Sequence, residues 1–314
     1  MRDAFVSQLT ALAAADPNVV LITGDLGFGV LTEFARRFPN QFVNAGVAEQ
    51  NMIGLATGMA LEGCTVFTYS IANFAFMRCL EQIRNDAAYH DCNVNVVCVG
   101  GGMSYGQLGV SHHATEDLAI MRSLPGVTVV SPGDDWEAAE ATKAIAGKPG
   151  VCYLRLDRVG KVDTHQEGDE PFRLGAARRV REGFDATLIA TGGVLAEAHS
   201  AAEMLSAAGV ECRVLSLHTL KPLDIGSLVA AANETGGVLT IEEHTVEGGL
   251  GGAVAETLLE HGARPGFFHR LGLRGGFASA VGSQQYLRKR YGIDADAIAA
   301  VVRERVARPL RVAA

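Results

Sequence analysis

Short β-branched runs alternate with longer helical patterns along the whole chain, and this alternation restricts the fold more than any other feature. In the first half the expected strands are 19–23, 64–70, 94–100, 127–132 and 151–156. These runs are apolar throughout, which is typical of parallel strands buried on both faces, with helices such as 74–89 crossing between them. The pattern predicts an α/β fold built on a doubly wound sheet.

A second alternating set follows a polar stretch without periodicity, residues 159–174, which is typical of an interdomain linker. Its expected strands lie within 186–193, 211–217, 237–244 and 267–273. A length of 314 residues fits about two domains. We therefore predict two doubly wound α/β domains, residues 1–158 and 175–314, joined by this linker.

The composition excludes several classes of protein. The net charge is −8 and the arginines are scattered, which argues against a nucleic-acid partner. No apolar run approaches the roughly 18 to 20 residues of a membrane helix, and the first residues lack the pattern of a signal peptide. The six cysteines form no CxxC pair and are expected to be reduced core thiols. A cytoplasmic location is the expectation.

Two glycine-rich stretches invite a phosphate-loop interpretation. TGDLGFG, residues 23–29, follows a strand but fits neither GxGxxG nor GxxxxGK[ST], so a tight turn is favoured. EGGLGG, residues 247–252, precedes a helix and could offer amide groups to an anion. Close helix packing explains it equally well.

Glu49 lies where a strand-like run gives way to a helix of small residues, in NAGVAEQNMIGLATGMA. An acidic residue is common in the first turn of a helix, because it interacts with the free amides and the helix dipole. The residue type alone leaves this interpretation open. The small residues of the helix, Gly54, Ala56, Gly58 and Ala60, would allow close packing at a subunit interface.

Several motifs occur together in one order. The first half contains, in this order, GDLG, NAGVAEQNMIGLATGMAL, YSIANFAFMRCLEQIRND, GVSHHATEDLAIMRSLPGVTVVSP and YLRLDR. The second half adds LSLHTLKPLD and EEHTVEGGLGGAVAE. In this order they resemble the transketolase family over nearly the whole chain. The resemblance is to the C-terminal subunit of a split transketolase, related to deoxyxylulose phosphate synthases and to the β subunits of 2-oxo-acid dehydrogenases. It implies a pyrimidine-binding domain followed by a transketolase C-terminal domain.

The resemblance implies roles for residues near a thiamine diphosphate cofactor. Glu49 matches the family glutamate that bonds to N1′ of the aminopyrimidine and so promotes loss of the thiazolium C2 proton, which requires a shielded site. Phe74 matches the aromatic residue that stacks on this ring. Ile71 and Met77 stand where relatives often carry aromatic residues, so a more aliphatic pocket is expected. Asp25 matches an aspartate near the cofactor, with turn capping as the alternative.

Other matches concern the substrate. His112 matches the histidine of the family's THQ motif, which faces the reacting carbons and can bond to a donor oxygen. His113 stands at the glutamine of that motif, and two histidines without a third ligand nearby make a metal site improbable. Arg158 matches the arginine that holds a sugar phosphate, for which its planar fork is suited.

The chain departs from the family pattern at the substrate site. Leu108, beside Gln107, stands where relatives carry an aspartate that binds a donor hydroxyl. A buried leucine there would leave that hydroxyl unpaired, at a cost of about 1–3 kcal/mol. Gly29 and Gly100 stand at phosphate-clamping Ser and His positions. We therefore expect an unusual donor or acceptor, such as a modified or nonphosphorylated sugar.

The chain also lacks the GDG motif with which the family's Mg²⁺ and diphosphate site begins. The resemblance therefore implies an N-terminal partner subunit that holds the metal, an α2β2 heterotetramer, and a transferase of two-carbon ketol units that is active only with this partner. Two alternatives stay open: the β subunit of a 2-oxo-acid dehydrogenase, and a noncatalytic interaction subunit of the same fold.

Overall fold

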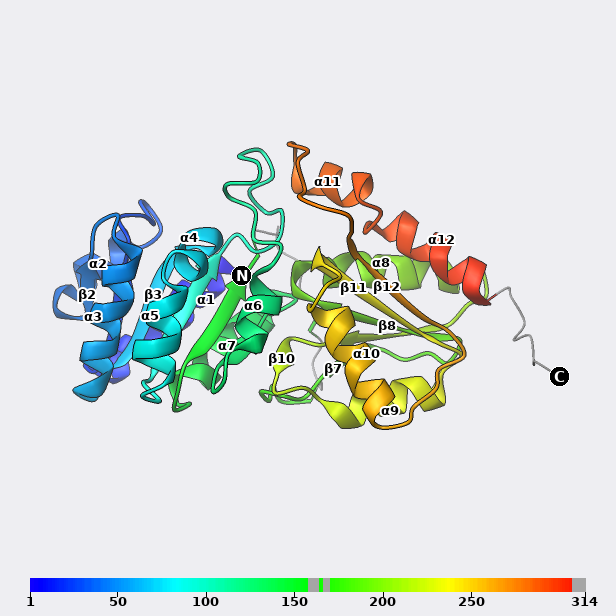
Figure 1. Ribbon diagram of the computed structural model, residues 1–314, viewed down its shortest axis with the longest axis horizontal. Helices are drawn as coiled ribbons and strands as arrows, with labels where there is room; N and C mark the ends of the chain where they lie inside the picture. Colours follow the sequence, from blue (N-terminus) through cyan, green and yellow to red (C-terminus); the bar gives the residue numbers. More distant parts are fainter. Residues whose placement is uncertain (158–163, 166–169, 307–314) are drawn as a thin grey trace.

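A computed structural model describes residues 1–157, 164–165 and 170–306 of the chain. Its two α/β lobes lie side by side, the first at the left of Figure 1 and the second at the right. The first sheet has the strand order β10-β5-β6-β4-β3-β1-β2 and the second the order β12-β11-β8-β9-β7. The strands are parallel except for β10, which is antiparallel to β5, and β7, which is antiparallel to β9.

The strands of the first lobe are β1 (Val19–Thr23), β2 (Phe42–Asn44), β3 (Thr65–Ile71), β4 (Val94–Val99), β5 (Thr128–Val130) and β6 (Cys152–Leu156). The later strands are β7 (Arg178–Arg181), β8 (Ala186–Thr191), β9 (Cys212–Ser216), β10 (Thr219–Lys221), β11 (Val238–Thr245) and β12 (Phe268–Leu273). The helices that come before residue 158 are α1 (Arg2–Ala15), α2 (Thr32–Arg37), α3 (Glu49–Leu61), α4 (Ala72–Met77), α5 (Leu80–Gln82), α6 (Asp117–Ser123) and α7 (Asp135–Ala146). Those after it are α8 (Leu195–Ser206), α9 (Ile225–Glu234), α10 (Leu250–Glu260), α11 (Gln284–Arg290) and α12 (Ala295–Val306).

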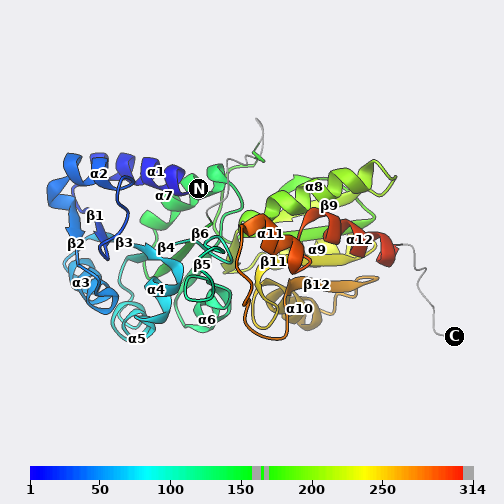
Figure 2. The ribbon, with the colours of Figure 1, turned by 90° about the horizontal axis from the view of Figure 1, so that it is seen from above.

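Helices cover both faces of the first sheet. Seen from above in Figure 2, α1, α2 and α7 lie on one face and α3 to α6 on the other. The continuous apolar run of β1 explains this arrangement, because Val20 and Ile22 join one core while Val19 and Leu21 join the opposite one. The predicted doubly wound α/β class is confirmed for both lobes.

The core between the two lobes is continuous. Val96 and Tyr153 of the first sheet belong to the same apolar cluster as Ile189 and Leu215 of the second sheet. Strand β10 comes from the second half of the chain but completes the first sheet. The lobes are therefore joined by a shared core as well as by the connecting segment.

The expectations about single elements have different outcomes. The helix expected over 74–89 is interrupted: α4 ends at Met77, α5 begins at Leu80, and a π-helical turn spans Ile83–Ala88. Of the small residues of α3, Ala56 is buried, whereas Gly54 and Gly58 are exposed and a Cβ atom at either would meet no atom within 4 Å. Their packing at a subunit interface stays a prediction. All six cysteines are free thiols, as expected, and five are buried. In the described part of the chain, no helix combines the length and apolarity needed to span a membrane.

Candidate functional site

Glu49 is the first residue of α3, where the chain turns back from the end of β2. Its side chain is only 4% exposed although it carries a carboxylate. Both carboxylate oxygens accept hydrogen bonds from Nη1 of Arg78 at 3.1 Å. Gly24 lies beside it, since a Cβ atom there would be 3.7 Å from Cγ of Glu49. The carboxylate is thus buried at the carboxyl edge of the first sheet.

Phe74, in α4, is linked to this carboxylate through Arg78. The guanidinium carbon of Arg78 lies 4.3 Å from the centre of the Phe74 ring. The ring of His112 meets Phe74 edge-on, with the ring centres 5.2 Å apart. The structure therefore brings together three of the predicted residues, Glu49, Phe74 and His112, through Arg78. Of the two flanking positions, Ile71 is half-buried and Met77 is 48% exposed.

The loop after β4 carries His112. The amide of His112 donates to the carbonyl of Gly109, and its Nδ1 atom lies 3.0 Å from Oγ of Ser111. Nδ2 of Asn73, in α4, donates to the carbonyl of Ser111 at 2.7 Å. This bond fastens the loop to the helix that carries Phe74. His112 is thereby positioned by α4 as well as by its own loop.

Tyr105, which was not predicted, occupies the space beside Gly100. Gly100 has a φ of +87°, and a Cβ atom added to it would lie 2.1 Å from Cε2 of Tyr105. The ring centres of Tyr105 and His112 are 6.3 Å apart. An aromatic side chain from the same loop thus fills the place of a side chain at position 100. In contrast, a Cβ atom at Gly29 would meet no atom within 4 Å.

Asp25 is part of the tight turn after β1. It has a φ of +57°, its amide donates to Oδ1 of Asn44, and Nδ2 of Asn44 donates back to its carboxylate at 3.0 Å. A short polar side chain tolerates this left-handed conformation well. The turn-forming alternative therefore has direct structural support, while a cofactor contact of Asp25 stays a prediction.

In the described part of the chain, no hydrogen bond or ion pair links the side chains of the remaining predicted substrate residues to Glu49, Phe74 or His112. Leu108 is 55% exposed, so the expectation of a buried leucine there is wrong, and Gln107 beside it is also exposed. His113 is buried, and this burial lowers the pKa of its imidazole. Arg158 lies outside the described residues. The roles of Gln107, Leu108 and Arg158 stay predictions.

A cavity of about 560 Å³ opens beside Glu49 and is lined by residues 47–51 and Arg78. Phe74 does not line this cavity and is linked to it through Arg78, which contacts both the Phe74 ring and Glu49. A buried carboxylate that faces free volume, with an aromatic face one side chain away, offers the two groups that recognise a flat nitrogen heterocycle such as an aminopyrimidine. Among the described residues, no group of three or more His, Cys, Asp and Glu could hold a metal ion. The buried Glu49 carboxylate, the free volume beside it and the Phe74 ring reached through Arg78 fit the pyrimidine half of the expected cofactor.

The second glycine-rich stretch contacts an anion that belongs to the chain itself. The Glu242 carboxylate accepts hydrogen bonds from the amides of Leu250 and Gly251, at 2.7 and 2.8 Å. Burial raises the pKa of Glu242 to about 7, although these two bonds act in the opposite direction. The amino end of α10 is thus closed by Glu242, so the motif EGGLGG serves packing rather than a phosphate ligand.

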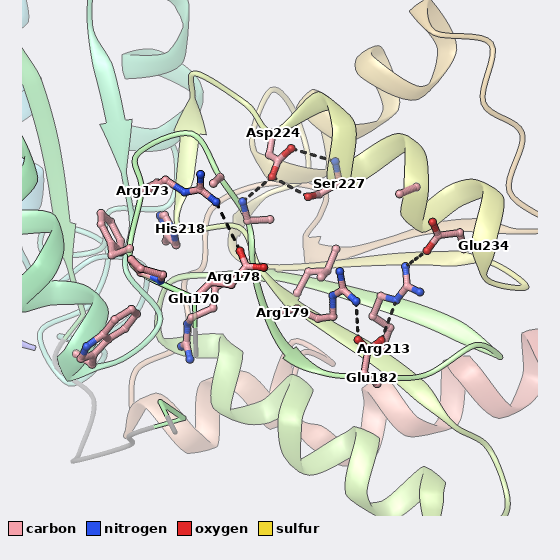
Figure 3. A pocket seen from close by; sticks show the side chains of 17 residues that line it. Glu170, Arg173, Arg178, Arg179, Glu182, Arg213, His218, Asp224, Ser227 and Glu234 are labelled. Atoms are coloured by element: carbon pink, nitrogen blue, oxygen red, sulfur yellow. Dashed lines mark hydrogen bonds and ion pairs between the residues drawn. The ribbon is translucent and has the colours of Figure 1, made fainter. Parts of the chain in front are cut away.

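A second cavity, of about 540 Å³, lies in the second lobe and at its junction with α7 (Figure 3). Its arginines are paired with carboxylates. Arg179 contacts Glu182, Arg213 contacts Glu234, and Arg178 binds both Asp134 and Glu137. Because these charges are balanced within the chain, the cavity is an ion-pair network rather than a clear anion site, and none of the predicted site residues lines it.

Two family models match the chain, one over each lobe. Residues 1–159 match the family model described as "Transketolase, pyrimidine binding domain", and residues 175–298 match "Transketolase, C-terminal domain". The chain is 39% identical over 261 residues to one of the subunits of an apulose-4-phosphate transketolase from Phocaeicola vulgatus, covering 83% of this chain and 84% of that protein. It is 38% identical to a 6-deoxy-6-sulfo-D-fructose transketolase subunit of Clostridium sp., covering 97% and 94%.

Among solved structures, the chain is similar to one described as "Split gene transketolase, inactive beta4 tetramer". The TM-score is 0.86 and the identity 36%, and the match covers 98% of this chain and 97% of that one.

Proposed function

Since this chain belongs to the transketolase family, we propose that it is the C-terminal subunit of a split, thiamine-diphosphate-dependent transketolase. In this proposal it helps to transfer a two-carbon ketol unit from a ketose-type donor to an aldehyde acceptor. The observation that carries the proposal is the buried carboxylate of Glu49, which Arg78 links to the face of Phe74. The lobe that contains both residues would form the pyrimidine-binding domain, residues 1–158, and residues 175–314 the C-terminal domain.

Each residue of the site has a proposed task. Glu49 holds a proton at N1′ of the aminopyrimidine, and its burial keeps water away from this proton. Phe74 orients the flat ring by stacking. His112, fixed by its own loop and by Asn73, is placed to bond to an oxygen of the donor. When bound, thiamine diphosphate supplies the electron sink that the transfer of a two-carbon unit requires.

The diphosphate and its Mg²⁺ are assigned to an N-terminal partner, in an α2β2 assembly. The absence of a GDG motif from the sequence supports this assignment. Two relatives are named as subunits, and the similar solved structure is described as an inactive tetramer of β chains. We infer that this chain also self-associates and is inactive without its partner.

The proposed donor or acceptor differs from the standard pentose phosphates. Leu108 offers no hydrogen-bond acceptor where the family pattern has an aspartate, and the ring of Tyr105 fills the space beside Gly100. The names of the two relatives refer to apulose 4-phosphate and to a sulfonated deoxyfructose, neither of which is a standard substrate of the pentose phosphate pathway. These names support a modified sugar as the substrate class.

The proposal is tested by reconstitution. A chain that carries GDG and its downstream Asn, encoded in an adjacent reading frame, is purified separately and mixed with this chain, thiamine diphosphate and Mg²⁺. We expect co-purification of the two chains, and ketol transfer by the mixture but by neither chain alone. Acyl transfer to lipoamide would instead identify a 2-oxo-acid dehydrogenase. A stable complex without any activity in a screen of ketose donors and aldehydes would favour a noncatalytic subunit.

A further inference from the structure

Arg78 makes two contacts that the proposed cofactor also needs. Its Nη1 atom donates to both oxygens of Glu49 at 3.1 Å, and its guanidinium carbon lies 4.3 Å from the centre of the Phe74 ring. The carboxylate is the proposed partner of N1′, and the ring is the proposed stacking face. One side chain therefore engages both recognition elements at once.

The guanidinium of Arg78 and the aminopyrimidine of the cofactor share chemical features, so that one can replace the other. A guanidinium is flat, presents N–H donors at its edge and stacks on aromatic faces. An aminopyrimidine protonated at N1′ is likewise flat, with an N–H donor at its edge. Both favour an aromatic face next to a carboxylate. Only one of them can bind the Phe74 ring and the Glu49 carboxylate at a time, because the guanidinium covers the ring and contacts both oxygens of Glu49.

Arg78 lies between two helices, with its side chain half in solvent. Arg78 follows the last residue of α4, and Cys79 separates it from the start of α5. The Arg78 side chain is 50% exposed, whereas that of Glu49 is 4% exposed. An ion pair with one partner in solvent is weak, so that a ligand can displace the exposed partner. The buried carboxylate, in contrast, stays in place for either partner.

We propose that Arg78 occupies the place of the aminopyrimidine in the unassembled chain and is displaced when the cofactor enters. This inference rests on the proposed function. It makes Arg78 a placeholder that neutralises the buried Glu49 carboxylate until the partner delivers the cofactor. Cofactor binding then competes with an internal ligand, which lowers the affinity of the free chain for the pyrimidine half.

The first test measures this competition with thiamine, which lacks the diphosphate and therefore needs no metal from the partner. The dissociation constant is measured by calorimetry for the full chain, for Arg78→Ala and for Arg84→Ala. Arg84 is an exposed arginine of the same segment that bonds to its neighbour Asn85 and lies outside the site. We expect Arg78→Ala to bind thiamine about tenfold more tightly than the other two proteins. Equal or weaker binding by Arg78→Ala would overturn the proposal.

The second test observes Arg78 directly and does not depend on affinity. In the free chain the Nε–Hε signal of Arg78 should show an upfield ring-current shift, which Phe74→Leu abolishes. This shift should disappear when partner, Mg²⁺ and thiamine diphosphate are added. A signal without the shift in the free chain, or a shift that persists in the loaded complex, would overturn the role of Arg78. If neither the wild-type pair nor the Arg78→Ala pair binds thiamine diphosphate, the proposed function itself fails. If both pairs bind thiamine diphosphate but the shift of Arg78 does not change, only the role of Arg78 fails.

Discussion

Glu242 shows at the scale of one residue how the fold uses a buried acid. Its carboxylate accepts two amide hydrogen bonds at the start of α10, and its side chain is fully buried. Desolvation is the largest effect on this group and raises its pKa to about 7 from 4.5. The folded chain therefore binds a proton at Glu242 more tightly than the unfolded chain does.

The sign of the pH dependence follows from this shift. The stabilising contribution of Glu242 is fully present below pH 4.5, and it is lost as the pH rises through about 7. Over that range the contribution changes by up to about 3 kcal/mol. Burial lowers the pKa of several histidines, including His244 beside Glu242, and these groups act in the opposite direction, so the prediction compares the chain with a variant. We expect the free energy of unfolding at pH 5 minus that at pH 8 to be smaller in Glu242→Gln than in the unaltered chain. Denaturant unfolding at both pH values measures it.

The control for this prediction is Glu260→Gln, an exposed acid at the other end of α10. It should leave the pH dependence unchanged. An undiminished difference between pH 5 and pH 8 in Glu242→Gln would contradict the assignment to this carboxylate.

At the scale of elements, the strands of the first sheet could be predicted where they are apolar and continuous. The run 19–23 coincides with β1, and 94–100 contains β4. Strand β10 could not be predicted, because it has three residues and its partner β5 lies far away in the sequence. The interruption after Met77 was also missed, since periodicity continues across it.

The end of α4 at Met77 separates the part of the site that could be predicted from the part that could not. The resemblance identified Glu49, Phe74 and His112, and the structure places them in one cluster through Arg78. The pairing of Arg78 with Glu49 could not be read from the sequence, because it depends on where α4 ends. A lone arginine amid the apolar residues 74–80 was the available signal.

The loop after β4 gives a prediction at this scale. A side chain at Gly100 would both adopt a φ of +87° and collide with the ring of Tyr105. Gly29 has a similar φ of +77° but open space around it. Gly100→Ala should therefore lower the free energy of unfolding by about 1–3 kcal/mol more than Gly29→Ala does. If thermal or denaturant unfolding shows equal losses of free energy of unfolding in the two variants, the Tyr105 ring moves aside without an energetic penalty, and the prediction is wrong.

At the scale of the whole molecule, charged side chains join the two lobes in addition to the shared core. The buried Arg155 pairs with Asp117 at 3.0 Å and donates to the carbonyls of Ala114 and Glu243. The carboxylate of Glu243 in turn accepts from the amide of Met103 and from Arg288. The pyrimidine-binding lobe is thus held firmly on the C-terminal lobe. What the chain lacks, in our proposal, is the partner that binds the other half of the cofactor.

The most direct test of this account is the turnover of Glu49→Gln in the reconstituted pair. The matched control is Glu62→Gln, an exposed acid at the opposite end of α3. We expect Glu49→Gln to lower kcat on the order of 10²- to 10⁴-fold, because it removes the group that holds the proton at N1′, and Glu62→Gln to leave kcat unchanged. Undiminished ketol transfer by the Glu49→Gln pair would contradict the central claim that this carboxylate activates the cofactor.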